Sequence, residues 1–258
     1  MLDIYVINLD RRRDRLLAMT EKLAALELSF ERVRAVDGLG DADIGFSDDH
    51  PRLTKPEYAC YLSHVECWRR LIDSNAERCL ILEDDVHLSP NIGDVLNRDV
   101  LFSHDFGVTR LETLGSRCYL AVRPLFQSGP YNVRRSVTYQ GGTGAYVISR
   151  AHALKLLETQ ATPHIPVDDL IYDERQDVFG RPFIAQVVPG MAIQDIYFPP
   201  GKTDDRKNSD MIEIREANRL ILAAKMPVWR RSARLFKTAI YRIFKRVGFR
   251  KETVIFDQ

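Results

Sequence analysis

The sequence predicts an α/β fold in which helices cover a sheet of mostly parallel strands. Short apolar runs alternate with amphipathic stretches along the chain, and this alternation favours a parallel sheet with crossover helices. A composition of 45% hydrophobic and 28% charged residues over 258 positions is that of a globular protein with a large core. We therefore expect a main domain over residues 1–224 and a basic tail over residues 225–258.

The first elements are expected near the N-terminus. Ile4 to Ile7 form an apolar run between polar residues, which predicts a strand over residues 3–8. Leucines at roughly helical spacing predict the helix that follows it. A second strand is expected over residues 30–36, and the stretch from Asp37 to Pro56, rich in glycine, aspartate and proline, predicts a long loop.

The remaining elements follow from the same patterns. Apolar positions at helical intervals predict a helix over residues 57–75, and the apolar run after it predicts a strand over residues 79–82. Further strands are expected over residues 106–111, 119–122, 137–139 and 145–148. Further helices are expected over residues 150–159, with Ser149 as N-cap, and over residues 167–179 and 211–224.

Cysteine usage and hydropathy limit the class of protein. Cys60, Cys67, Cys79 and Cys118 contain no Cys-x-x-Cys pair and lie in predicted helices or strands, which predicts free thiols without a zinc site or disulfide. The apolar runs are far shorter than the roughly 20 residues that span a bilayer, so no transmembrane helix is expected. The N-terminus lacks the features of a secretory signal, and we expect a cytoplasmic protein.

The acidic triplet Glu83-Asp84-Asp85 is the most informative motif, because it directly follows an apolar strand. Open α/β sheets bind their ligands at the carboxyl ends of strands. Adjacent carboxylates repel one another, so desolvating them requires a cation or strong donors. We predict that Glu83 and Asp85, on the same side of an extended chain, bind Mn²⁺ or Mg²⁺ together with substrate phosphates. A solvated acidic turn is the alternative.

A basic segment at residues 10–15 follows the first strand and opens a helix. Guanidinium groups and free backbone donors at a helix start bind anions, which makes Arg12 and Arg15 candidates for contact with a diphosphate. In the alternative, the arginines face solvent and pair with neighbouring aspartates, and this suits Arg11 and Arg13 better.

Two later segments are further candidates for the site. Gly142, Thr143 and Gly144 precede an apolar strand, and glycines let a backbone approach a ligand closely, although a tight turn is the simpler interpretation. Asp168 and Asp169 begin a predicted helix, where a carboxylate can cap the N-terminus or serve as the general base for a hydroxyl group.

Taken together, these segments resemble glycosyltransferase family 25 and stand in the order of that family. The matching segments are residues 5–9 with Arg12, Asp14 and Arg15; residues 34–38; residues 57–64 with Trp68; residues 80–86; residues 142–149; and Pro166 with Asp168. They cover the chain discontinuously from about residue 3 to residue 195. Several moderately specific motifs in one order identify a family better than any one of them.

The resemblance implies a GT-A type, Rossmann-like domain that binds a nucleotide-sugar through a metal ion and transfers the sugar with inversion. It favours UDP-galactose as the donor and a glycan or lipid-linked glycan, such as lipooligosaccharide, as the acceptor. The donor-binding residues it implies are Asn8, Arg12, Arg15, Ala35, Asp37, Ser63, His64, Gly142, Thr143 and Gly144. Asp168 is the preferred base, with Asp169 and Asp195 as the other choices.

The C-terminal tail combines apolar positions at helical spacing with basic residues. Of the 37 lysines and arginines, 10 lie within residues 225–251, which leaves 27 against 34 acidic residues before that stretch. This pattern predicts an amphipathic helix that binds an anionic membrane surface through residues 227–250, placing the protein peripherally on the inner face of the membrane. In the alternative, the tail docks on the acidic body. Nucleic-acid binding is not expected, since no matching basic surface appears elsewhere.

Two other functions remain open. The same carboxylates serve nucleotidyltransferases and phosphohydrolases, although the sequence has no P-loop or nucleophile motif. A non-catalytic family member would bind a glycan or a membrane, but the intact Glu83, Asp85 and glycine turn speak against loss of the metal site.

Overall fold

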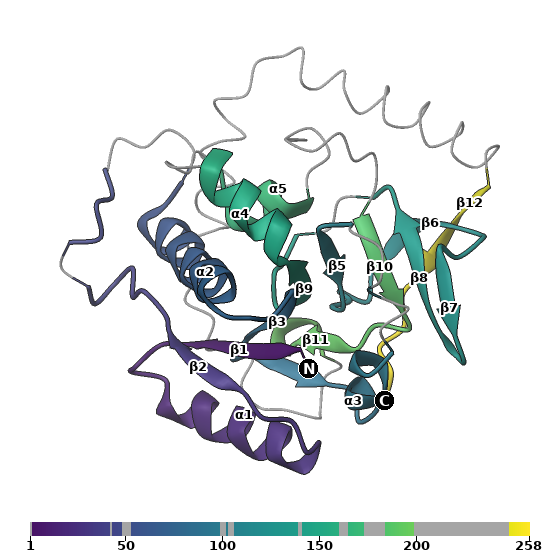
Figure 1. Cartoon of the computed structure of the whole chain (residues 1–258), viewed down its shortest axis with the longest axis horizontal. Coiled ribbons are helices and arrows are strands. Elements are labelled where there is room, and N and C mark those ends of the chain that lie inside the picture. The colour runs from purple at the N-terminus through teal and green to yellow at the C-terminus, as the bar shows by residue number, and fades with distance from the viewer. Residues whose placement is uncertain are drawn as a thin grey trace.

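The computed structural model describes residues 2–41, 43–47, 53–98, 102, 106–138, 141–159, 165–172, 184–198 and 248–258. In this part of the chain, helices flank a central mixed sheet (Figure 1). The strands are β1 (Asp3–Asn8), β2 (Glu31–Arg34), β3 (Arg78–Glu83), β4 (Val86–Leu88), β5 (Val108–Arg110), β6 (Arg117–Ala121), β7 (Phe126–Ser128), β8 (Tyr131–Ser136), β9 (Ala145–Ser149), β10 (Ile184–Val188), β11 (Ala192–Gln194) and β12 (Phe249–Thr253). The helices are α1 (Arg13–Ala25), α2 (Lys55–Asp73), α3 (Ile92–Leu96), α4 (Arg150–Thr159), α5 (Val167–Tyr172) and the 3-10 helix η3 (Asp195–Tyr197).

The main sheet has the order β12-β6-β8-β10-β5-β9-β3-β1-β2, with β7 beside β8, and β4 pairs separately with β11. The α/β class is confirmed, but the expectation of a mostly parallel sheet is wrong. Parallel pairing joins β1 to β2, β1 to β3 and β5 to β10, whereas the other described strand pairs are antiparallel. Strand β9 runs antiparallel to β3, and the Glu83 amide donates to the carbonyl of Gly144, so β9 starts beside the end of β3.

This reversal decides which residues meet. Strand β9 runs antiparallel to both β3 and β5, so β3 and β5 point the same way. The residues that follow β3 and β5 therefore lie at the edge of the sheet where β9 begins. Glu83, Glu112 and Gly144 meet at this edge, although the chain between them is long.

A capping motif fixes the first residue of helix α2. The Thr54 hydroxyl accepts from the Glu57 amide while the Glu57 carboxylate accepts from the Thr54 amide, which forms a capping box. From this start, the helix buries Trp68 and Leu71 against Tyr5 of β1. Helix α1 packs its Met19 among the side chains of the opposite sheet face, so α1 and α2 cover opposite faces, as Figure 1 shows.

Most predicted elements before residue 172 are confirmed, among them the strands at residues 3–8 and 79–82. The Ser149 cap is also confirmed, since its hydroxyl accepts from the His152 amide at 3.3 Å. The strand predicted over residues 137–139 is wrong, because β8 ends at Ser136 after a hairpin turn at Gly129, which adopts a φ of 59°. The helix predicted over residues 211–224 lies outside the described residues. The four cysteines are free thiols, as expected.

The end of the chain belongs to the sheet. Strand β12 pairs antiparallel with β6, and the amide of Gly190 donates to the carbonyl of Ile255. Residues 248–258 are therefore part of the main body, which corrects their assignment to a separate tail, because backbone pairing holds them at the sheet edge. Residues 225–247 lie outside the described residues. No helix in the described part of the chain is long and apolar enough to cross a membrane.

Candidate active site

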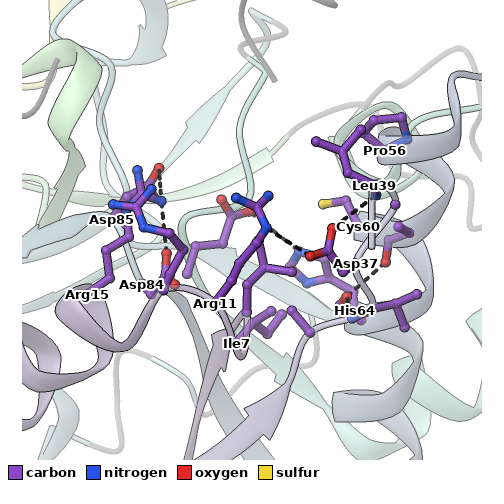
Figure 2. Close-up of a pocket in the computed structure, with 18 residues that line it drawn as sticks. Ile7, Arg11, Arg15, Asp37, Leu39, Pro56, Cys60, His64, Asp84 and Asp85 are labelled. Atoms are coloured by element: carbon purple, nitrogen blue, oxygen red, sulfur yellow. Dashed lines mark hydrogen bonds and ion pairs between the residues drawn. The ribbon is translucent and has the colours of Figure 1, made fainter. Parts of the chain in front are cut away.

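A cleft of about 160 Å³ opens at the carboxyl ends of β1, β2 and β3. Figure 2 shows its lining side chains, which come from the start of α1, the loop after β2, the first half of α2 and the residues at the end of β3. The predicted site residues among them are Arg12, Arg15, Ala35, Asp37, Ser63, His64, Glu83 and Asp85. The fold thus gathers four separate sequence motifs around one cleft.

Arginines from the start of α1 form the basic wall of the cleft, which we define as Arg11, Arg12 and Arg15. Arg11 pairs with Asp37 across the cleft at 2.8 Å, and Arg12 pairs with Asp14 at 2.8 Å. Pairing with a neighbouring aspartate, the alternative expected for Arg11 and Arg13, is thus seen for Arg12. Arg12 nevertheless lines the cleft, because the helix begins at its edge.

Asn8 lies beneath the cleft, where it joins the basic wall to the acidic motif. Its side chain is buried, and its amide nitrogen donates to the carbonyl of Arg12 at 2.9 Å and to Oδ2 of Asp84 at 2.7 Å. Its amide oxygen accepts from Arg32 at 3.0 Å. In this structure Asn8 therefore supports the site instead of lining the cleft.

The acidic motif divides into residues with different surroundings. Strand β3 ends at Glu83 and the next two residues form a turn, so the expectation of an extended chain through Asp85 is wrong. Asp84 accepts from Arg15 at 3.1 Å. Oδ1 of Asp85 is buried and has no partner among the described residues. Burial, followed by the charge of Glu83, raises the pKa of Asp85 to about 7, against the opposing effect of Arg15.

Glu83 is held by two side-chain donors. Its Oε1 accepts from the Thr143 hydroxyl at 2.7 Å, and its Oε2 accepts from the Gln194 amide at 3.0 Å. Nε2 of His64 lies 3.5 Å from Oε1. Because the two donors come from the glycine turn at residues 142–144 and from β11, the direction of the carboxylate is set by the fold.

The glycine turn, which consists of Gly142, Thr143 and Gly144, is shaped by neighbouring side chains. A Cβ on Gly142, whose φ is 91°, would lie 3.1 Å from the carboxylate of Glu112. A Cβ on Gly144 would lie 2.9 Å from side-chain carbons of both Val86 and Gln194. Close approach by protein side chains therefore explains these glycines, and the side chain of this turn that contacts the Glu83 carboxylate is Thr143. The three turn residues are not among those lining the cleft.

Glu112 is a buried carboxylate at this edge that the sequence analysis did not single out. Its Oε2 accepts from the Gly144 amide at 3.0 Å, and Arg110 lies 3.5 Å away. Burial raises the pKa of Glu112 to about 8, which outweighs the attraction of Arg110. Glu112 follows the strand predicted over residues 106–111 just as Glu83 follows its own strand, so the same rule applied again would have found it.

The two predicted bases lie beside the glycine turn. Oδ2 of Asp168 accepts from the Gly142 amide at 3.2 Å, and the Asp168 side chain is buried. Asp168 and Asp169 both lie in the first turn of α5, as expected. Neither residue is among those that line the cleft.

A histidine–aspartate pair flanks the acidic motif on its other side. Nε2 of His87 forms a hydrogen bond with Asp195, whose backbone amide donates to the carbonyl of Asp85 at 2.8 Å. The ring of His87 stacks on Phe198 with centroids 4.0 Å apart. Burial raises the pKa of Asp195, but the hydrogen bond and charge of His87 outweigh burial, so the net pKa is lowered.

The acidic motif fits a hard divalent cation. The buried Oδ1 of Asp85 is an oxygen ligand without a donor among the described residues, and burial raises the pKa of Asp85 although Arg15 lies 3.6 Å from its Oδ2. A second possible group consists of Cys60, His64 and Glu83, which place one ligand atom each within 4.8 Å of one another. Sulfur and nitrogen ligands suit zinc better than Mg²⁺ or Mn²⁺.

Comparison with known proteins identifies the family. Residues 1–171 match glycosyltransferase family 25, described as LPS biosynthesis protein. The chain belongs to this family.

Individual relatives agree with this assignment. A putative glycosyltransferase of Haemophilus influenzae is 28% identical over 205 residues, which cover 76% of this chain and 71% of that protein. The inactive glycosyltransferase 25 family member 3 of Mus musculus is 32% identical over 189 residues, which cover 66% of this chain and 31% of the mouse protein. Among solved structures, galactosyltransferase LgtC with donor and acceptor sugar analogs aligns with 14% identity and a TM-score of 0.39, covering 90% of this chain and 99% of that one.

Proposed function

We propose that this chain is an inverting glycosyltransferase that transfers galactose from UDP-galactose to a glycan or lipid-linked glycan such as lipooligosaccharide. The observation that carries this proposal is the cleft itself, which joins a basic wall, an acidic motif and a partly apolar pocket at the ends of three strands. A nucleotide-sugar has matching parts, because an anionic diphosphate lies between an aromatic base and a polar sugar. Family membership supports the reaction class.

The donor would lie across the cleft. Ala35 and Asp37 would contact the nucleoside, because they line the part of the cleft beside Leu39 and Pro56, where apolar surface suits a base. Arg12 would approach the diphosphate, since guanidinium groups match phosphate oxygens. Ser63 is held close by, with its hydroxyl accepting from the Val36 amide at 2.9 Å.

A divalent cation, Mn²⁺ or Mg²⁺, would be held by Asp85 and Glu83. When bound, it would neutralise charge on the departing diphosphate. The protein's own contribution is to keep these carboxylates directed, since Thr143 and Gln194 fix Glu83 while Arg15 restrains the motif beside it.

The acceptor hydroxyl would attack the anomeric carbon as the bond to the diphosphate breaks, and a carboxylate would take the hydroxyl proton. Asp168 is the proposed base, because it lies beside Gly142 at the edge of the sheet that carries the acidic motif. Asp169 and Asp195 are the alternatives. Asp168→Asn should lower kcat with little change in the dissociation constant for UDP, and an unchanged kcat would move the assignment to Asp169 or Asp195.

We further propose that the part of the basic tail before β12, residues 227–247, binds an anionic membrane surface and so brings the cleft to a lipid-linked acceptor. The support comes from the basic and apolar pattern of the sequence. Replacing Arg230, Arg231 and Arg234 by glutamine should abolish co-sedimentation with vesicles that contain anionic lipid. Unchanged sedimentation would reject the proposal and favour docking of this segment on the protein body.

The test of the donor site is thermal stability against a panel of nucleotide diphosphates and nucleotide-sugars, with and without Mn²⁺. A ligand at 100 times its dissociation constant stabilises a protein by about 2.7 kcal/mol. We expect a Mn²⁺-dependent shift that is largest with UDP and UDP-galactose. A shift with nucleoside triphosphates alone would favour a nucleotidyltransferase or phosphohydrolase, and no shift with any nucleotide would favour a non-catalytic protein.

A further inference from the structure

A chain of buried polar side chains leads from the interior of the protein to the acidic motif. Nε1 of Trp68 donates to the hydroxyl of Tyr146 at 3.0 Å, and the same hydroxyl lies 2.9 Å from Nδ1 of His64. The other ring nitrogen of His64, Nε2, faces Oε1 of Glu83 at 3.5 Å. Trp68, Tyr146 and His64 are all completely buried.

The hydrogen atoms in this chain can be assigned from donor and acceptor capacity. The indole nitrogen of Trp68 is a donor only, so it occupies one lone pair of the Tyr146 oxygen. Burial raises the pKa of Tyr146 well above its usual range, so the hydroxyl keeps its hydrogen. Within the described residues, Nδ1 of His64 is the acceptor available to that hydrogen. Nδ1 is then an acceptor that carries no hydrogen, so the hydrogen of the imidazole lies on Nε2.

The hydrogen on Nε2 then faces Oε1 of Glu83. Nε2 is buried and forms no hydrogen bond at the distances found in the described residues. A buried donor without an acceptor is unfavourable, and an approach of about 0.5 Å toward Oε1 of Glu83 would give ordinary hydrogen-bond geometry. Glu83 would then receive a donor from α2 in addition to those from Thr143 and Gln194.

We propose that His64 is a positioning residue whose tautomer is fixed by Tyr146, so that its Nε2 hydrogen directs the Glu83 carboxylate toward the ligands in the cleft. This inference rests on the proposed function for the role of Glu83, but the tautomer itself does not. The tautomer also decides whether His64 donates a hydrogen bond to Glu83 or binds a metal ion together with Cys60 and Glu83. A metal ion held by Cys60, His64 and Glu83 would need the lone pair of Nε2, which the hydrogen occupies in this tautomer.

The tautomer is tested without turnover. In an imidazole nitrogen NMR spectrum of the protein, the resonances that disappear in His64→Gln should show an unprotonated Nδ1 and a protonated Nε2. Tyr146→Phe should turn this into a mixture of tautomers, because the hydroxyl hydrogen is lost. A protonated Nδ1 in the wild-type protein would overturn the proposal, whether or not the protein transfers a sugar.

The positioning role is tested by a matched pair of substitutions. The amide nitrogen of glutamine can take the place of Nε2, whereas asparagine reaches only the place of Nδ1. His64→Gln should therefore retain at least about tenfold more kcat than His64→Asn, as expected for a donor to a charged group. Equal loss in the two variants, or a smaller loss in His64→Asn, would overturn the role, because a structural function alone requires only the contact of Nδ1 with Tyr146, which asparagine can keep.

A third experiment tests whether Nε2 of His64 binds zinc. We expect Zn²⁺ to stabilise the wild-type protein and Cys60→Ser to the same extent in thermal unfolding. A zinc-dependent stabilisation that Cys60→Ser removes would show that Nε2 is a metal ligand, and it would overturn the proposal even if His64→Gln is active.

Discussion

The hydroxyl of Thr143 donates a hydrogen bond of 2.7 Å to Oε1 of Glu83, and so the glycine turn before β9 holds the first carboxylate of the acidic motif. This contact depends on the direction of β9, which begins beside the end of β3. The glycines on either side of Thr143 leave room for Glu112, Val86 and Gln194 to pack against the turn. Packing behind the turn therefore contributes to the geometry of the cleft.

Thr143→Val should lower transfer activity without unfolding the protein, because valine keeps the shape of threonine and removes the hydroxyl. Loss of one hydrogen bond to a charged group corresponds to about tenfold or more in kcat/KM. Thr143→Ser retains the hydroxyl and serves as the matched control. Equal activity of the valine and serine variants in a transfer assay would show that this contact does not direct Glu83.

Arg12→Gln should weaken binding of UDP by about tenfold, because a guanidinium contact with phosphate is replaced by a neutral amide. Arg12 pairs with the exposed Asp14, so little loss of stability is expected from the substitution. Arg13→Gln is the control, since Arg13 is exposed and does not line the cleft. Titration calorimetry that finds both variants equal to the wild type would remove Arg12 from the donor site.

Glu112→Gln should change the dependence of stability on pH. The pKa of Glu112 rises from an ordinary 4.5 to about 8 in the folded protein, so the folded state holds this proton more tightly than the unfolded state. The resulting stabilisation is fully present below pH 4.5 and is lost as the pH rises through 8. Glutamine cannot titrate, so the variant should lose less stability than the wild type over this range.

Urea unfolding of the metal-free protein at a series of pH values measures this difference directly. If the curves of free energy against pH stay parallel for the wild type and Glu112→Gln, Glu112 is ionised in the folded protein and its pairing with Arg110 outweighs burial.

The parts of the site that could be predicted are those that follow directly from a strand or helix end. Glu83 and Asp85 were found because they follow an apolar strand, and Arg12 because it precedes a helix. Apolar spacing also predicted α2, whose buried residues include Trp68 and Leu71.

Features that depend on strand direction could not be predicted in the same way. The contact of Thr143 with Glu83 requires β9 to run antiparallel to β3, which the alternation of elements did not indicate. The pair of His87 and Asp195 depends on the small sheet of β4 and β11, whose strands are too short to show a pattern. The turn at Asp84 and Asp85 was the alternative to an extended chain, and the sequence left both conformations open because aspartates that favour turns directly follow an apolar strand.

The most direct test of the account is Mn²⁺-stimulated turnover of UDP-galactose by the wild-type protein and by Asp85→Asn, with thermal stability measured for both. Asparagine removes a buried charge whose Oδ1 has no partner among the described residues, so the variant should be at least as stable as the wild type at pH 8. We predict that the variant nearly loses turnover and its stimulation by Mn²⁺. Wild-type turnover in Asp85→Asn would contradict the assignment of the metal site, and no turnover of UDP-galactose or other UDP-sugars by the wild type, with or without acceptor glycans, would contradict the proposed transfer.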